Sequence, residues 1–371
     1  MPRYIFAPPL ISACSSEFIL LRLAAMKEIL CRKLVRRNPF KIEHVPWILR
    51  VYRYPFDRWA TVGKQGLFGV HNFLLYFLYK KLFPFKITGT FLYTINGQPK
   101  RIHFNPRNAT FHILYFKAFE MGYEPQVAAL MDTLMPAKGT YYDIGSNWGW
   151  FSLFHASKPG FSGKIHAFEP YPPTYTDITS MVEQAGIGKF VQCHKIALSD
   201  EKGEASISLP DHIHSGCATV SAKGGSGTAI TQMTTLDDFC KDPPDVMKVD
   251  VEGFEAHVLN GAKETLRKYK PMIFFENKRD KDNLSETMQP ILILEQLGYV
   301  FYHLAWLRLH DGSPCLLGDD LDPSPQTEET LALVPFHSSE RMLRHDTMNI
   351  FACHKDRVSQ VEALCEKRQL A

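Results

Sequence analysis

YYDIGSNWGWFS, residues 141–152, is the stretch that decides the fold. Apolar residues lead to Asp143, then Gly145 and Gly149 permit a tight turn, and aromatic residues open a helical pattern. Glycines let a backbone approach a ligand closely, and an acid at a strand end accepts hydrogen bonds. The stretch therefore predicts a buried strand, a turn and a helix start that together form a nucleotide-type cofactor pocket.

A second strand signal follows at residues 164–170, KIHAFEP, and it ends in Glu169. A carboxylate at the end of the second strand of such a fold takes both hydroxyls of an unphosphorylated ribose. The alternative is a plain structural turn, because glycines are common in ordinary loops. The acid after the second strand favours the binding site.

From about residue 105 the chain alternates short apolar runs with helical patterns, which predicts an α/β domain over residues 105–371. We expect a Rossmann-like, mostly parallel sheet of seven strands with helices on both faces, and a terminal strand and helix within residues 337–371. The expected strands are residues 140–144, 164–168, 190–194, 246–250, 271–275, 299–304 and 348–353.

Composition is that of a globular protein, with 45% hydrophobic and 22% charged residues among 371. Eight cysteines are scattered without a Cys-x-x-Cys pair. They predict reduced, packed thiols and hence a cytoplasmic protein.

Charge divides the chain into a basic arm and an acidic body. Residues 1–101 hold 17 Lys and Arg against four acids, whereas the remainder holds 25 against 35. We expect residues 1–104 to be a basic, aromatic-rich, mainly helical extension. It is either a cap on the core or a peripheral contact with an anionic membrane, and an organelle-targeting peptide at its start is a third reading. No nucleic-acid-binding module accompanies the charge.

Acidic and amide side chains cluster at two later strand ends. Asp250 and Glu252 follow one strand, and Glu276 and Asn277 follow the next. Ligands bind beyond the carboxyl ends of parallel strands, so these groups are candidates for chemistry. Asp250, Glu276 and Asn277 suit Mg²⁺, and alternatively Asp250, Glu252 or Glu276 acts as a general base. A purely structural reading has Glu252 cap the following helix.

Two further residues carry open alternatives. Glu124 either closes over the cofactor or simply begins a helix. Lys248 lies inside a predicted strand, where it either steers an anionic group or pairs with a nearby acid.

Six motifs between residues 123 and 253, in their order and spacing, resemble those of an FkbM-type methyltransferase, and the resemblance covers about residues 108–305. The resemblance implies S-adenosylmethionine as cofactor, a class I methyltransferase fold and an oxygen acceptor on a small molecule or glycan. Ser146 stands where the family commonly has alanine. The motifs are Tyr123-Glu124-Pro125, residues 143–149, Ala167-Phe168-Glu169-Pro170, Ala197-Leu198-Ser199-Asp200, residues 235–239 and residues 248–253.

The resemblance also implies roles for single residues. Glu169 would hold the ribose, while Ala197 and Leu198 would lie near adenine. The positions of Asp250 and Glu276-Asn277 are similar to the Mg²⁺ ligands of catechol O-methyltransferase. The residues expected around the methionine part are Asp143, Gly145, Ser146, Asn147 and Gly149.

Two other classes of protein remain in view. An NAD-dependent oxidoreductase uses the same strand and acid arrangement, but normally with Gly-x-Gly-x-x-Gly, whereas Gly145 and Gly149 are separated by three residues. A non-catalytic cofactor-binding scaffold that docks on a membrane or partner is the second alternative.

Overall fold

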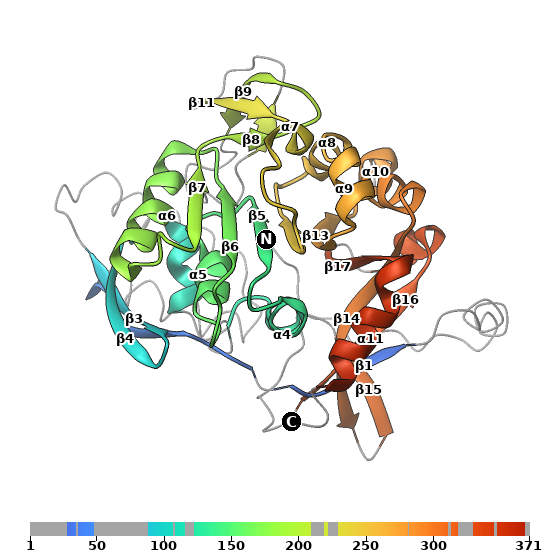
Figure 1. Cartoon of the computed structure of the whole chain (residues 1–371), viewed down its shortest axis with the longest axis horizontal. Coiled ribbons are helices and arrows are strands. Elements are labelled where there is room, and N and C mark those ends of the chain that lie inside the picture. The colour runs from blue at the N-terminus through green and yellow to red at the C-terminus, as the bar shows by residue number, and fades with distance from the viewer. Residues whose placement is uncertain are drawn as a thin grey trace, which may run out of the picture.

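The computed structural model is dominated by one ten-stranded mixed sheet, in the order β1-β16-β14-β17-β13-β12-β5-β6-β7, with β15 paired to β14 (Figure 1). The structure describes residues 28–34, 36–47, 88–106, 108–115, 122–208, 219–221, 229–280, 282–310, 313–317, 329–344 and 347–367.

Five neighbouring strands form the parallel part of this sheet. In β5 and β12 every residue is buried, as expected when helices cover both faces, whereas the edge strand β7 is partly exposed. All five were predicted from the sequence, three of them with ends shifted by one to three residues. They are β5 (Thr140–Ile144), β6 (Lys164–Phe168), β7 (Val191–His194), β12 (Val246–Val249) and β13 (Met272–Lys278).

The other half of the sheet is antiparallel, which corrects the prediction of seven mostly parallel strands. Two of its strands were predicted, and three come from segments that were assigned no strand. One of these, β1, lies in the predicted extension and pairs with β16. The strands are β1 (Ile29–Leu34), β14 (Tyr299–His310), β15 (Ser313–Leu317), β16 (Glu329–Phe336) and β17 (Thr347–His354).

Helices cover both faces of the sheet, as predicted. One core cluster joins the sheet to α4 (Pro125–Leu134), α5 (Trp150–Ala156), α6 (Pro172–Ala185) and α11 (Val358–Lys367). A second cluster joins the opposite face to α7 (Leu236–Phe239), α8 (Glu255–Asn260), α9 (Lys263–Tyr269) and α10 (Leu284–Gln296).

Two smaller sheets and three short 3-10 helices complete the described fold. A four-stranded sheet lies at the top of Figure 1 and contains β8 (Ala197–Leu198), β9 (Gly203–Ser208), β10 (Thr219–Ser221) and β11 (Ala229–Thr234). The short helices are η2 (Ala109–Leu114), η5 (Ser338–Leu343) and η6 (Lys355–Arg357).

The predicted mainly helical extension is corrected where the structure describes it. These parts form β1 and the three-stranded sheet of β2 (Phe40–His44), β3 (Gly89–Ile95) and β4 (Gln98–Phe104). Phe91 and Tyr93 of β3 are buried in the same core cluster as α4 and α5. The aromatic run at residues 73–79, on which the membrane prediction partly depends, lies outside the described residues.

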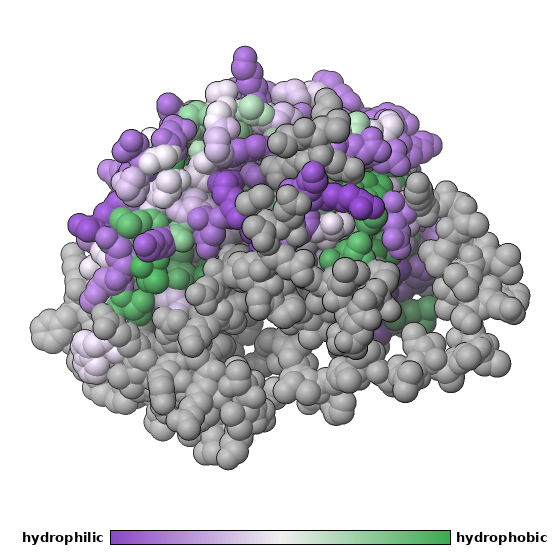
Figure 2. Space-filling model, turned by 90° about the horizontal axis from the view of Figure 1, so that it is seen from below, coloured by the Kyte–Doolittle hydropathy of each residue, from purple (hydrophilic) through white to green (hydrophobic). Residues whose placement is uncertain are grey.

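Figure 2 shows one face of the molecule, where hydrophilic side chains cover most of the visible described surface. Hydrophobic side chains gather there in smaller groups. Within the described ranges, no helix is long and apolar enough to cross a membrane.

The prediction that the cysteines are reduced is wrong for one pair. Cys31 of β1 and Cys365 of α11 form a disulfide, with Cα atoms 4.5 Å apart. Cys193, Cys240 and Cys353 are free thiols, as predicted. The pairing was not readable from the sequence, because 334 residues separate the two cysteines and only the fold brings them together.

We expect reduction of the disulfide to lower the free energy of unfolding by about 2–4 kcal/mol, because the unfolded chain regains the freedom that the cross-link removes. Urea unfolding with and without dithiothreitol measures the change. The double variant Cys31→Ser, Cys365→Ser should have the free energy of unfolding of the reduced wild-type protein, and dithiothreitol should not change it. Equal stability of the oxidised and reduced wild-type protein would contradict the cross-link.

Candidate functional site

The predicted site residues meet at one edge of the sheet, where β5, β6 and β12 end. β5 pairs in parallel with both β6 and β12, so the chain leaves all three strands on the same side. The amides of Gly145 and Ser146 both donate to the Phe168 carbonyl at 3.0 Å, and the Asp250 amide donates to the Ile144 carbonyl at 3.0 Å. These backbone bonds hold the glycine turn between the acids of the neighbouring strands.

Gly145 permits the closest of these approaches. Its φ is +83°, and a Cβ added there would lie 1.9 Å from the Asp250 carbonyl oxygen. No side chain fits at that distance, so glycine is required both for the turn and for the contact with the β12 end. Gly149 also has a positive φ, +92°, and stands at the N-cap of α5.

Asp143 is buried and bonded within the protein. The Tyr141 hydroxyl donates to Oδ1 at 3.0 Å, and the Ser152 hydroxyl donates to Oδ2 at 2.6 Å. Burial raises the pKa of Asp143, an effect that the Ser152 hydrogen bond opposes. Since Ser152 lies in α5, Asp143 ties the strand to the helix across the glycine turn. Its expected contact with the methionine part stays a prediction.

Glu169 and Asn147 lie in direct contact. The Asn147 amide donates to Glu169 Oε2 at 3.0 Å, and the Tyr171 amide donates to Oε1 at 2.9 Å. Asn147 has a φ of +50°, which turns its amide toward the acid. Burial raises the pKa of Glu169 to about 8 despite these two hydrogen bonds. Glu169 thus faces the glycine turn, as expected of a ribose-binding acid.

Ser146 has a buried hydroxyl group that forms no hydrogen bond within the described residues. Its side chain is 5% exposed, and its hydroxyl oxygen has no hydrogen-bond partner among the described residues. Such atoms are rare in folded proteins unless a ligand or water meets them. The hydroxyl lies in the same turn as Gly145, which fits a cofactor cradle.

Ala197 and Leu198 are buried in β8, which pairs with β11. Leu198 belongs to the core cluster that contains Phe168, one residue before Glu169. Their contact with an adenine ring stays a prediction.

Asp250, Glu252 and Glu276 come together as predicted. One carboxylate oxygen of each lies within 4.8 Å of the others, and all three side chains are partly exposed. Burial, followed by the charge of Asp250, raises the pKa of Glu252 to about 7 and of Glu276 to about 9. This carboxylate cluster could take up a proton near neutral pH, and its spacing also suits a divalent cation.

Asn277 does not share the orientation of this cluster, which corrects its assignment as a metal ligand. Its Nδ2 donates to the Thr287 carbonyl at 2.9 Å, and its Oδ1 accepts from Arg341 Nε. Successive side chains of a strand point to opposite faces, so Glu276 and Asn277 of β13 cannot both face the cluster. The amide oxygen is used to hold Arg341.

Glu124 stands at the N-cap of α4 in a left-handed conformation, with φ +43°. Its side chain makes no cap hydrogen bond, and its Oε2 lies 3.5 Å from Lys248 Nζ. Burial raises the pKa of Glu124, which the Lys248 charge opposes. It therefore begins a helix, as the second reading has it, and its expected contact with the cofactor stays a prediction.

Lys248 was the residue that sequence reasoning left undecided. Its side chain is 4% exposed, and its Nζ lies 2.6 Å from Asp250 Oδ2. Burial lowers the pKa of Lys248, but Asp250 and Glu124 more than offset this and raise it above the ordinary value. A lysine inside the otherwise apolar run VMKV was the available signal.

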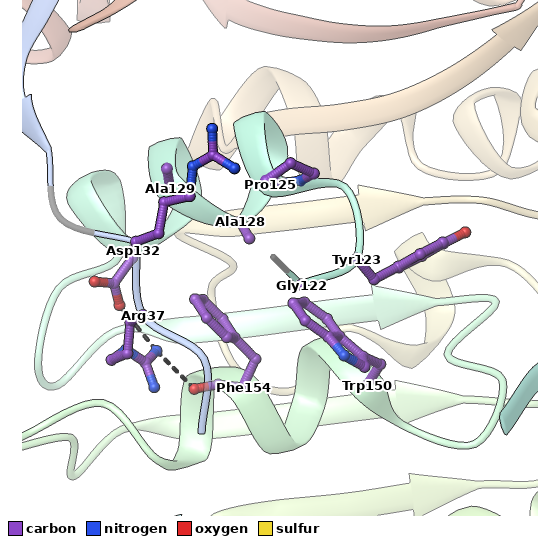
Figure 3. A pocket seen from close by; sticks show the side chains of 10 residues that line it. Arg37, Gly122, Tyr123, Pro125, Ala128, Ala129, Asp132, Trp150 and Phe154 are labelled. Atoms are coloured by element: carbon purple, nitrogen blue, oxygen red, sulfur yellow. Dashed lines mark hydrogen bonds and ion pairs between the residues drawn. The ribbon is translucent and has the colours of Figure 1, made fainter. Parts of the chain in front are cut away.

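A small pocket lies between α4, α5 and the segment around Arg37 (Figure 3). Arg37 partly fills this region, donating to Asp132 Oδ1 at 3.0 Å and to the Phe154 carbonyl at 2.8 Å. Neither Asp143 nor Glu169 lines the pocket. The lining residues are Arg36, Arg37, Gly122, Tyr123, Pro125, Ala128, Ala129, Asp132, Trp150 and Phe154.

Comparison with known proteins relates part of the chain to a known family. Residues 143–301 match the model of the methyltransferase FkbM domain. This region of the chain is therefore similar to the FkbM-type methyltransferases. The match begins at Asp143, the acid at the end of β5, and contains Glu169 and the whole carboxylate cluster.

A curated relative of the FkbM-type domain is the hexuronic acid methyltransferase AglP of Haloferax volcanii. It is 30% identical over 127 residues, which are 34% of this chain and 51% of the relative. The chain thus spans about half the length of the curated relative that it matches.

Solved structures resemble the chain less closely. The methyltransferase FkbM of Methylobacillus flagellatus KT is 15% identical with a TM-score of 0.34, covering 53% of this chain and 44% of that one. A SAM-dependent O-methyltransferase of Thermotoga maritima is 10% identical with a TM-score of 0.32, covering 66% and 78%.

Gly145→Ala should destabilise the protein by about 2 kcal/mol or more, because it combines a strained φ with overlap on the Asp250 carbonyl. Gly188→Ala is the matched control, since a Cβ there meets no atom within 4 Å. Thermal melting compares the two variants. Equal melting temperatures would show that the β5 turn and the β12 end are not in contact.

Glu169→Gln should flatten the decline of stability with pH. The pKa of Glu169 is about 8 in the fold against an ordinary value of 4.5, so the folded state binds the extra proton and loses stability as pH rises between these values. Melting temperatures from pH 5 to 8 measure the slope, with exposed Glu264→Gln as control. Parallel curves for Glu169→Gln and wild type would rule out a raised pKa.

Proposed function

We propose that this protein is an S-adenosylmethionine-dependent methyltransferase that acts on a hydroxyl oxygen of a small molecule or sugar. The observation that carries the proposal is the meeting of two sites at one sheet edge. The turn with Gly145 faces Glu169 on one side and touches Asp250 on the other. A donor held by the turn would therefore adjoin the carboxylate cluster.

The residues of the turn fit S-adenosylmethionine. Glu169 has carboxylate oxygens that already face the turn and can accept from two ribose hydroxyls, and the Ser146 hydroxyl awaits a partner. Gly149 opens α5, whose first amides suit a polar group. When bound, this cofactor supplies an electrophilic methyl group on a sulfonium sulfur.

The carboxylate cluster suits the other half of the reaction. Transfer to a hydroxyl forms a carbon–oxygen bond, breaks the carbon–sulfur bond and releases the hydroxyl proton, which needs an acceptor. Glu252, with its pKa raised to about 7, is ionised to a useful fraction at neutral pH and still basic enough to take a proton. Asp250 is fixed beside it by Lys248.

A divalent cation is the alternative way to acidify the hydroxyl. Asp250, Glu252 and Glu276 would hold it, with Glu252 in place of Asn277, and the ion would lower the pKa of Glu252 and of Glu276. The same crowding of carboxylates raises the pKa values of Glu252 and Glu276 and forms the oxygen-rich arrangement that a cation prefers, so the base and the cation are separated by experiment.

A sugar hydroxyl is the proposed acceptor. The support is the name of AglP, a hexuronic acid methyltransferase, together with a cluster of carboxylates that can accept hydrogen bonds from several hydroxyls. A membrane contact through the basic residues 1–104 would place the protein near membrane-bound glycans. We propose the membrane as a partner of the protein and not as a participant in the reaction.

Labelled S-adenosylmethionine with a panel of hexuronic acid glycosides tests the proposal. We expect a methylated product by mass spectrometry, and calorimetry should detect binding of S-adenosylmethionine but not of NAD. Glu252→Gln should lower the rate by about 100-fold or more, the range of a lost general base, and Asp250→Ala should lower it as well because Asp250 raises the pKa of Glu252. Cofactor affinity should be nearly unchanged in both variants. Glu264→Gln serves as the exposed control.

The outcomes separate the candidate mechanisms. Loss of activity in EDTA with recovery in Mg²⁺ would establish the cation instead of the base. Cofactor affinity that collapses in Asp250→Ala would mean that this residue holds the donor. Binding of S-adenosylmethionine without any product would favour the non-catalytic scaffold.

A further inference from the structure

Lys248 brings a positive charge into the centre of the site. It lies in β12 beside Asp143 of β5, its register partner, and is 3% exposed. Its ammonium nitrogen is 4.7 Å from the centre of the Phe151 ring. A lysine buried to this degree is costly unless opposite charges surround it, so the fold must provide them.

The two partners of Lys248 come from different elements of the fold. Asp250, at the end of its own strand, lies 2.6 Å from Nζ, and Glu124, at the start of α4, lies 3.5 Å from it. Asp250 belongs to the carboxylate cluster, whereas Glu124 precedes a helix on the face that carries α5 and the glycine turn. One ammonium therefore joins the carboxylate cluster to the start of α4.

The contact with Lys248 occupies one of the two carboxylate oxygens of Asp250. Since Oδ2 is taken by Lys248, Oδ1 is the oxygen left for a hydroxyl or for a neighbouring acid. The Phe151 ring below the ammonium limits its motion, because a cation over an aromatic face is held there electrostatically. The carboxylate of Asp250 is thus oriented by the Lys248 ammonium, and the Phe151 ring restricts the position of that ammonium.

We propose that Lys248 is a positioning residue of the transfer reaction, whose ammonium fixes Asp250 and Glu124 relative to one another and so aligns acceptor with donor. The inference rests on the proposed function of the site. A misplacement of about 1 Å can lower a rate about 100-fold, so removing the ammonium should act on the transfer step. Cofactor binding depends on Glu169 and the glycine turn and should persist.

Three variants test the proposal in the full chain. Lys248→Met removes the charge at similar length, Lys248→Arg keeps the charge with another geometry, and Lys268→Met removes an exposed lysine of α9 that does not interact with the carboxylate cluster. The probes are S-adenosylmethionine, by calorimetry, and methyl transfer to the hexuronic acid glycoside that the wild-type protein turns over best.

We expect kcat to fall about 100-fold in Lys248→Met and about 10-fold in Lys248→Arg, with Kd for S-adenosylmethionine within about threefold of wild type. Lys268→Met should keep the wild-type kcat. If Lys248→Met fails to melt cooperatively, Lys248→Arg decides alone, and the same split between kcat and Kd is expected.

Other outcomes overturn the proposal. Wild-type kcat in Lys248→Met, or in Lys248→Arg where that variant decides alone, would remove the positioning role while leaving the methyltransferase function intact. Loss of cofactor binding in step with kcat would make Lys248 part of the donor site. No transfer by the wild-type protein would overturn the proposed function, and the role of Lys248 with it.

Discussion

The close approach of the β5 turn to the end of β12 is the constraint on which the site depends. The backbone at Gly145 meets the carbonyl of Asp250 at a distance that no Cβ allows, while the same turn is bonded to the Phe168 carbonyl. Three strand ends are therefore held together by main-chain contacts. Side chains at those ends face a common space because the parallel pairing brings them to the same edge.

Burial of charge is the second theme of the site. Asp143, Glu169 and Glu124 all have a raised pKa, with burial as the leading cause, and Lys248 supplies a cation among them. Groups arranged in this way destabilise the fold relative to apolar packing and are characteristic of functional sites. The apolar clusters on both faces of the sheet provide the compensating stability.

The site could be predicted from the sequence where its signal is local. A strand that ends in Asp143, a turn with two glycines and a strand that ends in Glu169 each occupy a few adjacent residues, and the structure brings them together as expected. The failures have a different character. Asn277 was assigned beside Glu276, although the alternation of side chains in a strand separates neighbours.

Antiparallel strands and long-range pairs were the other failures. β1 finds its partner β16 about 300 residues away, and the Cys31–Cys365 disulfide closes the same seam against α11. Short apolar segments such as residues 29–34 do not by themselves reveal whether they pair, or with what. Hydrophobic period and turn residues therefore do not determine which distant segments meet.

The sequence by itself determined the parallel strands, the glycine turn and the acids at the strand ends, because hydrophobic run, turn chemistry and acid position are properties of neighbouring residues. Only the tertiary structure decided that Lys248 joins Asp250 to Glu124, that Asn277 belongs to Arg341 and that the extension completes the sheet. Those outcomes depend on which side chains face each other across different elements, and that is settled by packing of the whole chain.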